Sequence, residues 1–139
     1  MTVPGADAAV LVPGPPVRGR GLVFTAPISF WGGVDPGTGR VADVRHPQHG
    51  MSIAGTVLFL PGTIGSSSAS AVLLELVHIG LAPAALVLHE PDAILLLGLI
   101  VAREMGWPAP MALRLDRDRH GVFEQQTVSV GSDGRIWAT

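Results

Sequence analysis

The chain has 139 residues, enough for one domain with a hydrophobic core and too few for two domains of ordinary size. Hydrophobic residues make up 47% of the sequence and charged residues 14%, a balance that excludes an intrinsically disordered chain. The net charge of −2 comes without any cluster of basic residues, which argues against a nucleic-acid partner. The sequence contains no cysteine, so this chain cannot form a disulfide, a thiol nucleophile or a cysteine-bound cluster.

Residues 1–17 predict a flexible lead-in to a single domain that spans residues 18–139. Proline and glycine recur in this segment, at Pro4-Gly5 and over residues 13–16, and they disfavour regular structure. The segment lacks the basic start and the continuous apolar run of a signal peptide. The longest apolar stretch, residues 93–102, is about half of the roughly 20 residues that cross a bilayer. We therefore expect a soluble, cytoplasmic protein without a membrane partner.

The first part of the domain predicts one short strand followed by long loops. Residues 20–25 form a β-type run. Residues 30–39 contain too much glycine and proline for a helix or a central strand, and residues 45–50 predict a second loop. Residues 52–60 then predict a strand, whose apolar end at residues 57–60 is typical of a buried sheet.

The second part of the domain alternates strands with helices. Serines precede the apolar run 71–79 and Gly80 follows it, which predicts a helix with serine at its start and glycine after its end. Residues 84–89 predict a buried strand. Pro91 and Asp92 suit the first turn of a second helix, which we expect to end near residue 105. The last predicted strands are residues 111–114, 127–130 and 135–137.

This order of elements predicts a mixed α/β fold. The two strand–helix passages in the middle of the chain require parallel pairing, whereas the ends favour antiparallel pairing. We expect a mixed sheet or a small β/β/α barrel, flanked by two helices.

The best candidate for a functional site is the junction at residues 58–70, where a predicted strand leads through a glycine-rich turn into a predicted helix. Its central segment, residues 61–68, is called the serine turn below. Its glycines allow a tight turn with outward-facing backbone N–H groups, and a helix N-terminus adds unpaired donors and positive potential. Such a junction stabilises an anion, or a serine oxygen that gains negative charge. Composition alone favours the simpler alternative, in which the serines only cap the helix. The turn lacks the Lys-Ser/Thr ending of a P-loop, so we do not predict nucleotide binding.

Other polar residues do not complete a second site. His46 and His49 lie in a loop near Asp43, and loop histidines without a third ligand are more often solvated than bound to a metal. Charges of alternating sign over residues 114–120 are typical of a solvated edge or turn. Glu75, among leucines, is expected to point outward from the first helix. We predict no metal site in this chain.

Several separated motifs resemble the small subunit, or swivelling domain, of the aconitase X family. They are Gly19-Arg20-Gly21, residues 27–36 with Thr38-Gly39, His46-Pro47, residues 52–55, residues 65–68, Ala82-Pro83 and Glu90-Pro91-Asp92. The resemblance covers most of the chain, from Gly19 to about Gly106. It implies the swivelling β/β/α barrel-like fold of aconitase-type enzymes, and a hydro-lyase that dehydrates a small hydroxy acid.

The resemblance also implies which residues act and which belong to a partner. In this family the first serine after a Gly-x-x-Gly turn is the proton acceptor, a position that corresponds to Ser66. The implied substrate-binding residues are Gly65, Ser67 and Ser68. The implied cleft or interface loop consists of Phe30, Trp31, Gly32, Gly33 and Asp35. An iron or iron–sulfur centre is expected on a large subunit that pairs with this chain in a heterodimer. We expect no cofactor on this chain, and no activity without the large subunit.

One departure from the family pattern bears on the substrate. Many members carry a basic residue in the turn before the serine, whereas this turn reads Gly62-Thr63-Ile64-Gly65. A phosphorylated substrate would lose a counter-ion there, which favours cis-3-hydroxy-L-proline over mevalonate 5-phosphate. The alternatives are a mevalonate 5-phosphate dehydratase small subunit, a non-catalytic swivel-fold interaction module and an isolated anion-binding domain.

Overall fold

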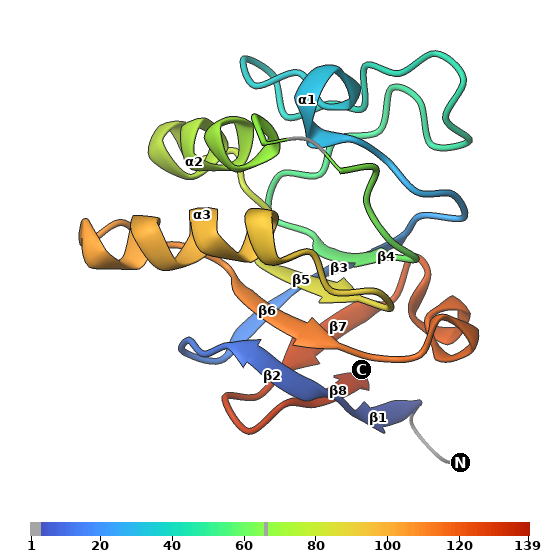
Figure 1. Cartoon of the computed structure of the whole chain (residues 1–139). Coiled ribbons are helices and arrows are strands. Elements are labelled where there is room, and N and C mark those ends of the chain that lie inside the picture. The colour runs from blue at the N-terminus through green and yellow to red at the C-terminus, as the bar shows by residue number, and fades with distance from the viewer. Residues whose placement is uncertain (1–3, 66) are drawn as a thin grey trace.

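Figure 1 shows the computed structural model, which describes residues 4–65 and 67–139 as one mixed sheet with helices packed on it. The strands are β1 (Gly5–Asp7), β2 (Ala9–Val12), β3 (Val17–Val23), β4 (Val57–Leu60), β5 (Ala85–Leu88), β6 (Met111–Arg114), β7 (Thr127–Val130) and β8 (Arg135–Ala138). The helices are α1 (Phe30–Gly33), α2 (Ala69–Ile79) and α3 (Ala93–Glu104), with 3₁₀ turns at Arg117–Arg119 and Gly121–Phe123. The predicted α/β class is confirmed.

The sheet has the strand order β1-β8-β7-β3-β4-β5-β6-β2. Strands β3, β4, β5 and β6 pair in parallel, and helices α2 and α3 provide two of the crossovers that parallel pairing requires. The remaining pairs are antiparallel. The predicted arrangement, with a parallel centre and antiparallel ends, is therefore confirmed.

The N-terminal segment closes this sheet into a barrel. Only Ala8 separates β1 from β2, yet β1 pairs with β8 at one end of the strand order and β2 pairs with β6 at the other. The Ala8 N–H donates to the Gly134 carbonyl (2.9 Å), which holds the segment on the sheet between the two pairings. The prediction of a flexible lead-in is wrong for residues 5–12, because the backbones of β6 and β8 offer them hydrogen bonds and closure removes both free edges.

Alternate residues of the parallel strands face two different cores. Val57 and Phe59 of β4 face the barrel interior, whereas Leu58 and Leu60 face the layer that contains α2 and α3. Strand β5 repeats this alternation, and both strands are buried throughout. Continuous apolar strands are expected where a parallel sheet is covered on both faces.

The barrel interior also holds His120. Its ring is buried 5.3 Å from the ring of Phe59, and its Nε2 lies 2.9 Å from the Leu115 carbonyl oxygen. Burial lowers the pKa of His120, because a charged ring would lose its hydration there. The ring is therefore neutral at pH 7 and donates from Nε2. The prediction of a solvated edge over residues 114–120 is wrong at this position.

Helix α1 is a single turn that the sequence did not predict. Its backbone breaks at Trp31, with ψ of 110°, and at Gly32, with φ of 81°. The left-handed conformation at Gly32 is one that glycine adopts without steric cost. The expectation that residues 30–39 contain no helix is wrong for residues 30–33 only. The break in the backbone at Trp31 and Gly32 prevents a longer helix.

Two predicted strands have different bounds in the structure. Strand β3 covers residues 17–23 rather than 20–25. Strand β4 begins at Val57, well inside the predicted range 52–60, because Gly55 has a φ of 70° and interrupts the extended backbone.

The two long helices begin and end close to the predicted residues. Helix α2 begins at Ala69, slightly before residue 71, and Gly80 ends it with a left-handed φ of 79°. Asp92 caps α3 by accepting the backbone N–H groups of Ile94 (2.9 Å) and Leu95 (3.2 Å). Glu75 is exposed, as predicted. Within the part of the chain that the structure describes, no helix has the length and apolarity that crossing a bilayer requires.

Candidate active site

The candidate site lies at the edge of the sheet where β4 ends and α2 begins (Figure 1). The described chain covers residues 61–65 and resumes at Ser67, so Ser66, the predicted catalytic residue, lies outside the described residues. Because β4 and β5 are parallel, their carboxyl ends meet at this edge. The Glu90 N–H, just after β5, donates to the Pro61 carbonyl (3.3 Å) and joins the two loops.

Two further contacts hold the serine turn in place. The Ile64 N–H donates to the Ile28 carbonyl (3.0 Å), so the turn runs beside the segment that leads into α1. The Thr63 hydroxyl donates to Asp92 Oδ2 (2.7 Å), while Oδ1 of the same carboxylate caps α3. Asp92 therefore connects the turn to the start of α3. The sequence predicts only the position of Asp92 at the helix start, because nothing local reveals a contact between residues 29 positions apart.

The predicted substrate-binding residues lie together on the surface at this edge. Gly65 and Ser67 are exposed, and Ser68 is partly buried at the N-cap position of α2. Ile64, just before them, has 58% of its surface exposed. The backbone N–H groups of the first turn of α2 add positive potential at the same edge. The substrate-binding role of these residues stays a prediction.

The predicted cleft loop divides into buried and exposed residues. Phe30 is fully buried in the core against α2, and Gly33 is buried against Ile28. Trp31, Gly32 and Asp35 are exposed. The expectation that Phe30 lines a cleft or an interface is therefore wrong, because its ring fills the core beneath the loop.

The exposed part of that loop borders a shallow apolar depression of about 420 Å³. Its lining residues are Trp31, Gly32, Val34, Asp35, Pro36, Ala42 and Val72. Val72 belongs to the first turns of α2, and its N–H lies 3.3 Å from the Ser68 carbonyl oxygen. The depression therefore adjoins the serine turn, and it offers an apolar wall next to the helix N-terminus.

Acidic side chains border the serine turn on the side of β5. Asp92 contacts Thr63, and a carboxylate oxygen of Glu90 approaches within 3.9 Å of the place that a Cβ on Gly62 would occupy. The nearby Arg114, at the end of β6, forms an ion pair with Asp116 (2.8 Å). The turn itself carries no positively charged side chain, so on this side no side chain of the turn offers a counter-ion to an anionic group.

Within residues 4–65 and 67–139, no three histidine, aspartate or glutamate side chains gather as a metal site. The interpretation of His46 as a solvated residue is wrong, because its ring is buried against Phe24. Its Nδ1 accepts the Gln48 N–H (3.0 Å), so Nε2 carries the proton and donates to the Ala26 carbonyl (3.0 Å). His46 therefore holds the loop 45–50 against the chain that follows β3.

The family model of the aconitase X swivel domain matches residues 6–138. The chain belongs to the aconitase X family. The match includes most of β1 and all of β2, so it begins well before residue 18, the domain start that the sequence predicts.

Two curated relatives show the swivel domain in different contexts. The phosphomevalonate dehydratase small subunit of Methanothermobacter thermautotrophicus is 44% identical over 123 residues, which cover 86% of this chain and 90% of that protein. The cis-3-hydroxy-L-proline dehydratase of Pseudomonas aeruginosa is 48% identical over 110 residues, which cover 76% of this chain but 19% of that protein. Related domains thus occur both as a short separate subunit and as a small part of a long chain.

The fold is also that of a solved aconitase X. The crystal structure of the holo-form from Thermococcus kodakaraensis matches with a TM-score of 0.84 and 30% sequence identity, and the match covers 98% of both chains. A UPF0107 protein solved by NMR in solution matches with a TM-score of 0.82 and 28% identity over 97% of this chain. The predicted swivelling, barrel-like fold is therefore confirmed.

Proposed function

We propose that this chain is the small subunit of an aconitase X-type hydro-lyase, and that Ser66 is the base that removes a proton from a small hydroxy acid. The observation that carries the proposal is the serine turn, whose Gly65 and Ser67 are exposed just before α2, in a chain of this family. The relatives that carry this domain are named as dehydratases, both as a separate subunit and as a single long chain.

The chemistry of dehydration explains why a serine at a helix start would be useful. The reaction removes a proton from the carbon next to a carboxylate and a hydroxyl from the neighbouring carbon, which leaves as water. The proton is only weakly acidic, so the base must be aligned with it. Ser66 would accept the proton as an alkoxide, whose negative charge the unpaired N–H groups at the start of α2 stabilise. Gly65, Ser67 and Ser68 would donate hydrogen bonds to the substrate.

The rest of the active site would belong to a large subunit. We assign the iron or iron–sulfur centre to that subunit, and no step at the metal to this chain, because its described residues offer no set of metal ligands. Trp31, Gly32 and Asp35 would face the cleft between the two subunits. The substrate is a metabolite, and we place the heterodimer in the cytoplasm.

We expect cis-3-hydroxy-L-proline to be the substrate. The serine turn carries no cation, and Glu90 and Asp92 border it, so a phosphate group would gain no counter-ion from this side of the chain. Mevalonate 5-phosphate is the second candidate. The relative from Methanothermobacter thermautotrophicus, 90% of which is covered by the match, is named a phosphomevalonate dehydratase small subunit.

The test is to purify the chain together with its large subunit under anaerobic conditions and to measure kcat/KM for both substrates. We expect kcat/KM for cis-3-hydroxy-L-proline to exceed that for mevalonate 5-phosphate by at least about tenfold, a difference of about 1.4 kcal/mol in the activation barrier. The reverse preference would identify the second candidate. A stable complex that dehydrates neither compound would favour the non-catalytic interaction module instead.

A further inference from the structure

Helix α3 is apolar on every side over most of its length. Residues 93–102 contain no charged or polar side chain, and the first charge is that of Arg103. A helix that is apolar all round is normally buried all round. Only one side of α3 is buried, where the helix packs against α2 and the sheet. The residues on this buried side are Leu95, Gly98, Leu99 and Ala102.

The opposite side of α3 is open. Its outer face consists of Ile94, Leu97, Ile100, Val101 and Met105, each with between 38% and 56% of its surface exposed. Spacings of three and four residues place these side chains on one side of the helix. Together they expose on the order of several hundred Å² of apolar surface, comparable to the largest patch on a typical monomer. That area is a large part of the roughly 800 Å² that each partner contributes to a stable interface.

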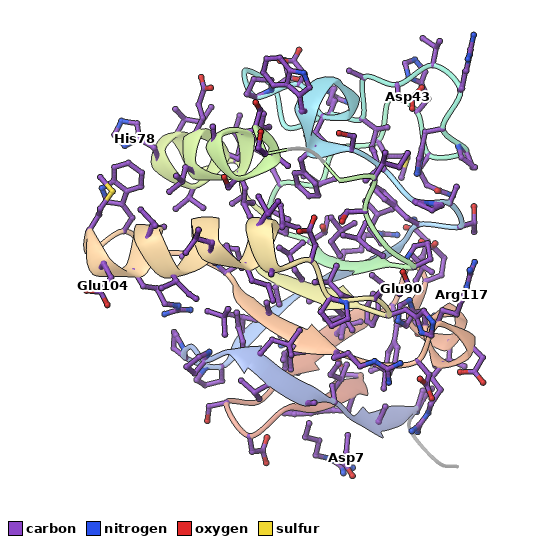
Figure 2. All side chains as sticks on the ribbon, in the orientation of Figure 1. Asp7, Asp43, His78, Glu90, Glu104 and Arg117 are labelled. Carbon is purple, nitrogen blue, oxygen red and sulfur yellow. The ribbon has the colours of Figure 1, made fainter. Side chains whose placement is uncertain are left out.

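The outer face of α3 begins at the candidate active site. Asp92 binds Thr63 of the serine turn and caps the helix, so Ile94 lies within the first turn after this contact. Ile64 of the serine turn is also an exposed apolar residue. Figure 2 labels Glu104 at the far end of α3, and Glu90 lies in the loop that precedes the helix, so α3 runs away from the loops at the end of β5. A partner that reaches Thr63 of the serine turn therefore comes close to the start of α3.

We infer that the outer face of α3 docks onto an apolar surface of the large subunit, so that the subunit interface extends from the serine turn along the helix. The inference rests on the proposed function, because it takes the large subunit as the partner. Relatives support this choice of occupant, since a similar domain is named a small subunit in one and is 19% of a longer chain in another. A second copy of this chain is the competing occupant.

Leu97→Asp tests the inference, with Val122→Asp as its matched control. Leu97 and Val122 are exposed to the same degree, 56% and 57%, but Val122 lies in a 3₁₀ turn remote in sequence from α3. Each full-length variant is titrated with the purified large subunit, and its folding is checked by circular dichroism and thermal unfolding.

We expect Leu97→Asp to raise the Kd by about 30-fold or more, as the loss of a central apolar anchor does. Val122→Asp should change the Kd by less than about twofold, within the range of a neutral contact. Leu97→Ser, which adds no charge, should give a smaller loss in the same direction.

The other outcomes separate the inference from the proposed function. If Leu97→Asp and Leu97→Ser bind the large subunit as the wild type does, the outer face of α3 is not the docking surface. If the lone chain is a dimer that only Leu97→Asp dissociates, and the large subunit binds unchanged, a second copy covers α3 and the inference is wrong. If the wild-type chain does not bind the large subunit at all, the proposed function fails and the inference fails with it.

Discussion

Replacing Ser66 with alanine is expected to lower kcat of the assembled enzyme by about 10²- to 10⁴-fold, the usual contribution of a positioned base. The substitution removes the only oxygen of this side chain and leaves the neighbouring turn with its contacts to Ile28 and Asp92. The two subunits should therefore still associate, and KM should change little. Steady-state dehydration kinetics, together with size-exclusion chromatography of the complex, measure both effects.

Ser67→Ala is the matched control, because Ser67 is exposed at the same helix start and is expected to bind substrate rather than take the proton. It should raise KM more than it lowers kcat. Exchange of the substrate proton in deuterated water gives an independent readout, since loss of the base should abolish this exchange. Turnover and exchange at wild-type rates in Ser66→Ala would exclude Ser66 as the base.

Replacing Phe59 with alanine is expected to reduce the free energy of unfolding by about 3–5 kcal/mol. Phe59 is fully buried in the barrel, where its ring stacks on Phe123 with centroids 5.2 Å apart and planes 6° from parallel. Strand β4 is paired on both sides, so the barrel can collapse only partly into the cavity. Urea unfolding of the isolated chain measures the change.

Val122→Ala provides the comparison for Phe59→Ala. Val122 is also apolar but exposed, so its truncation should change the free energy of unfolding by less than about 0.5 kcal/mol. A loss below about 1 kcal/mol for Phe59→Ala would contradict a packed barrel interior around this ring.

The central elements of the fold are predictable because their signals are local. The apolar runs of β4 and β5 are buried on both faces, and Gly80 and Asp92 mark helix ends by their own backbone and side-chain chemistry. Barrel closure is not predictable in this way. Residues 5–12 lie between the proline and glycine residues at positions 4–5 and 13–16. Their pairing depends on β6 and β8, which lie far along the sequence.

The same distinction applies to the candidate site. Glycines and serines in order along residues 61–68 are enough to predict a turn that leads into a helix. The bond between Thr63 and Asp92 depends on the parallel register of β4 and β5, which no local pattern encodes. Adjacent aromatic residues show the same limit: Phe30 is buried and Trp31 is exposed, and no local pattern distinguishes them.

The dehydration rate of the purified large subunit, titrated with this chain, tests most directly whether the chain is a catalytic small subunit. We expect no turnover by either protein alone, because the base and the metal centre are assigned to different chains. Turnover should rise with added chain and level off at equal amounts of the two proteins. A large subunit that reaches its full rate alone, or a stable complex that turns over no hydroxy acid, would contradict this division of the active site.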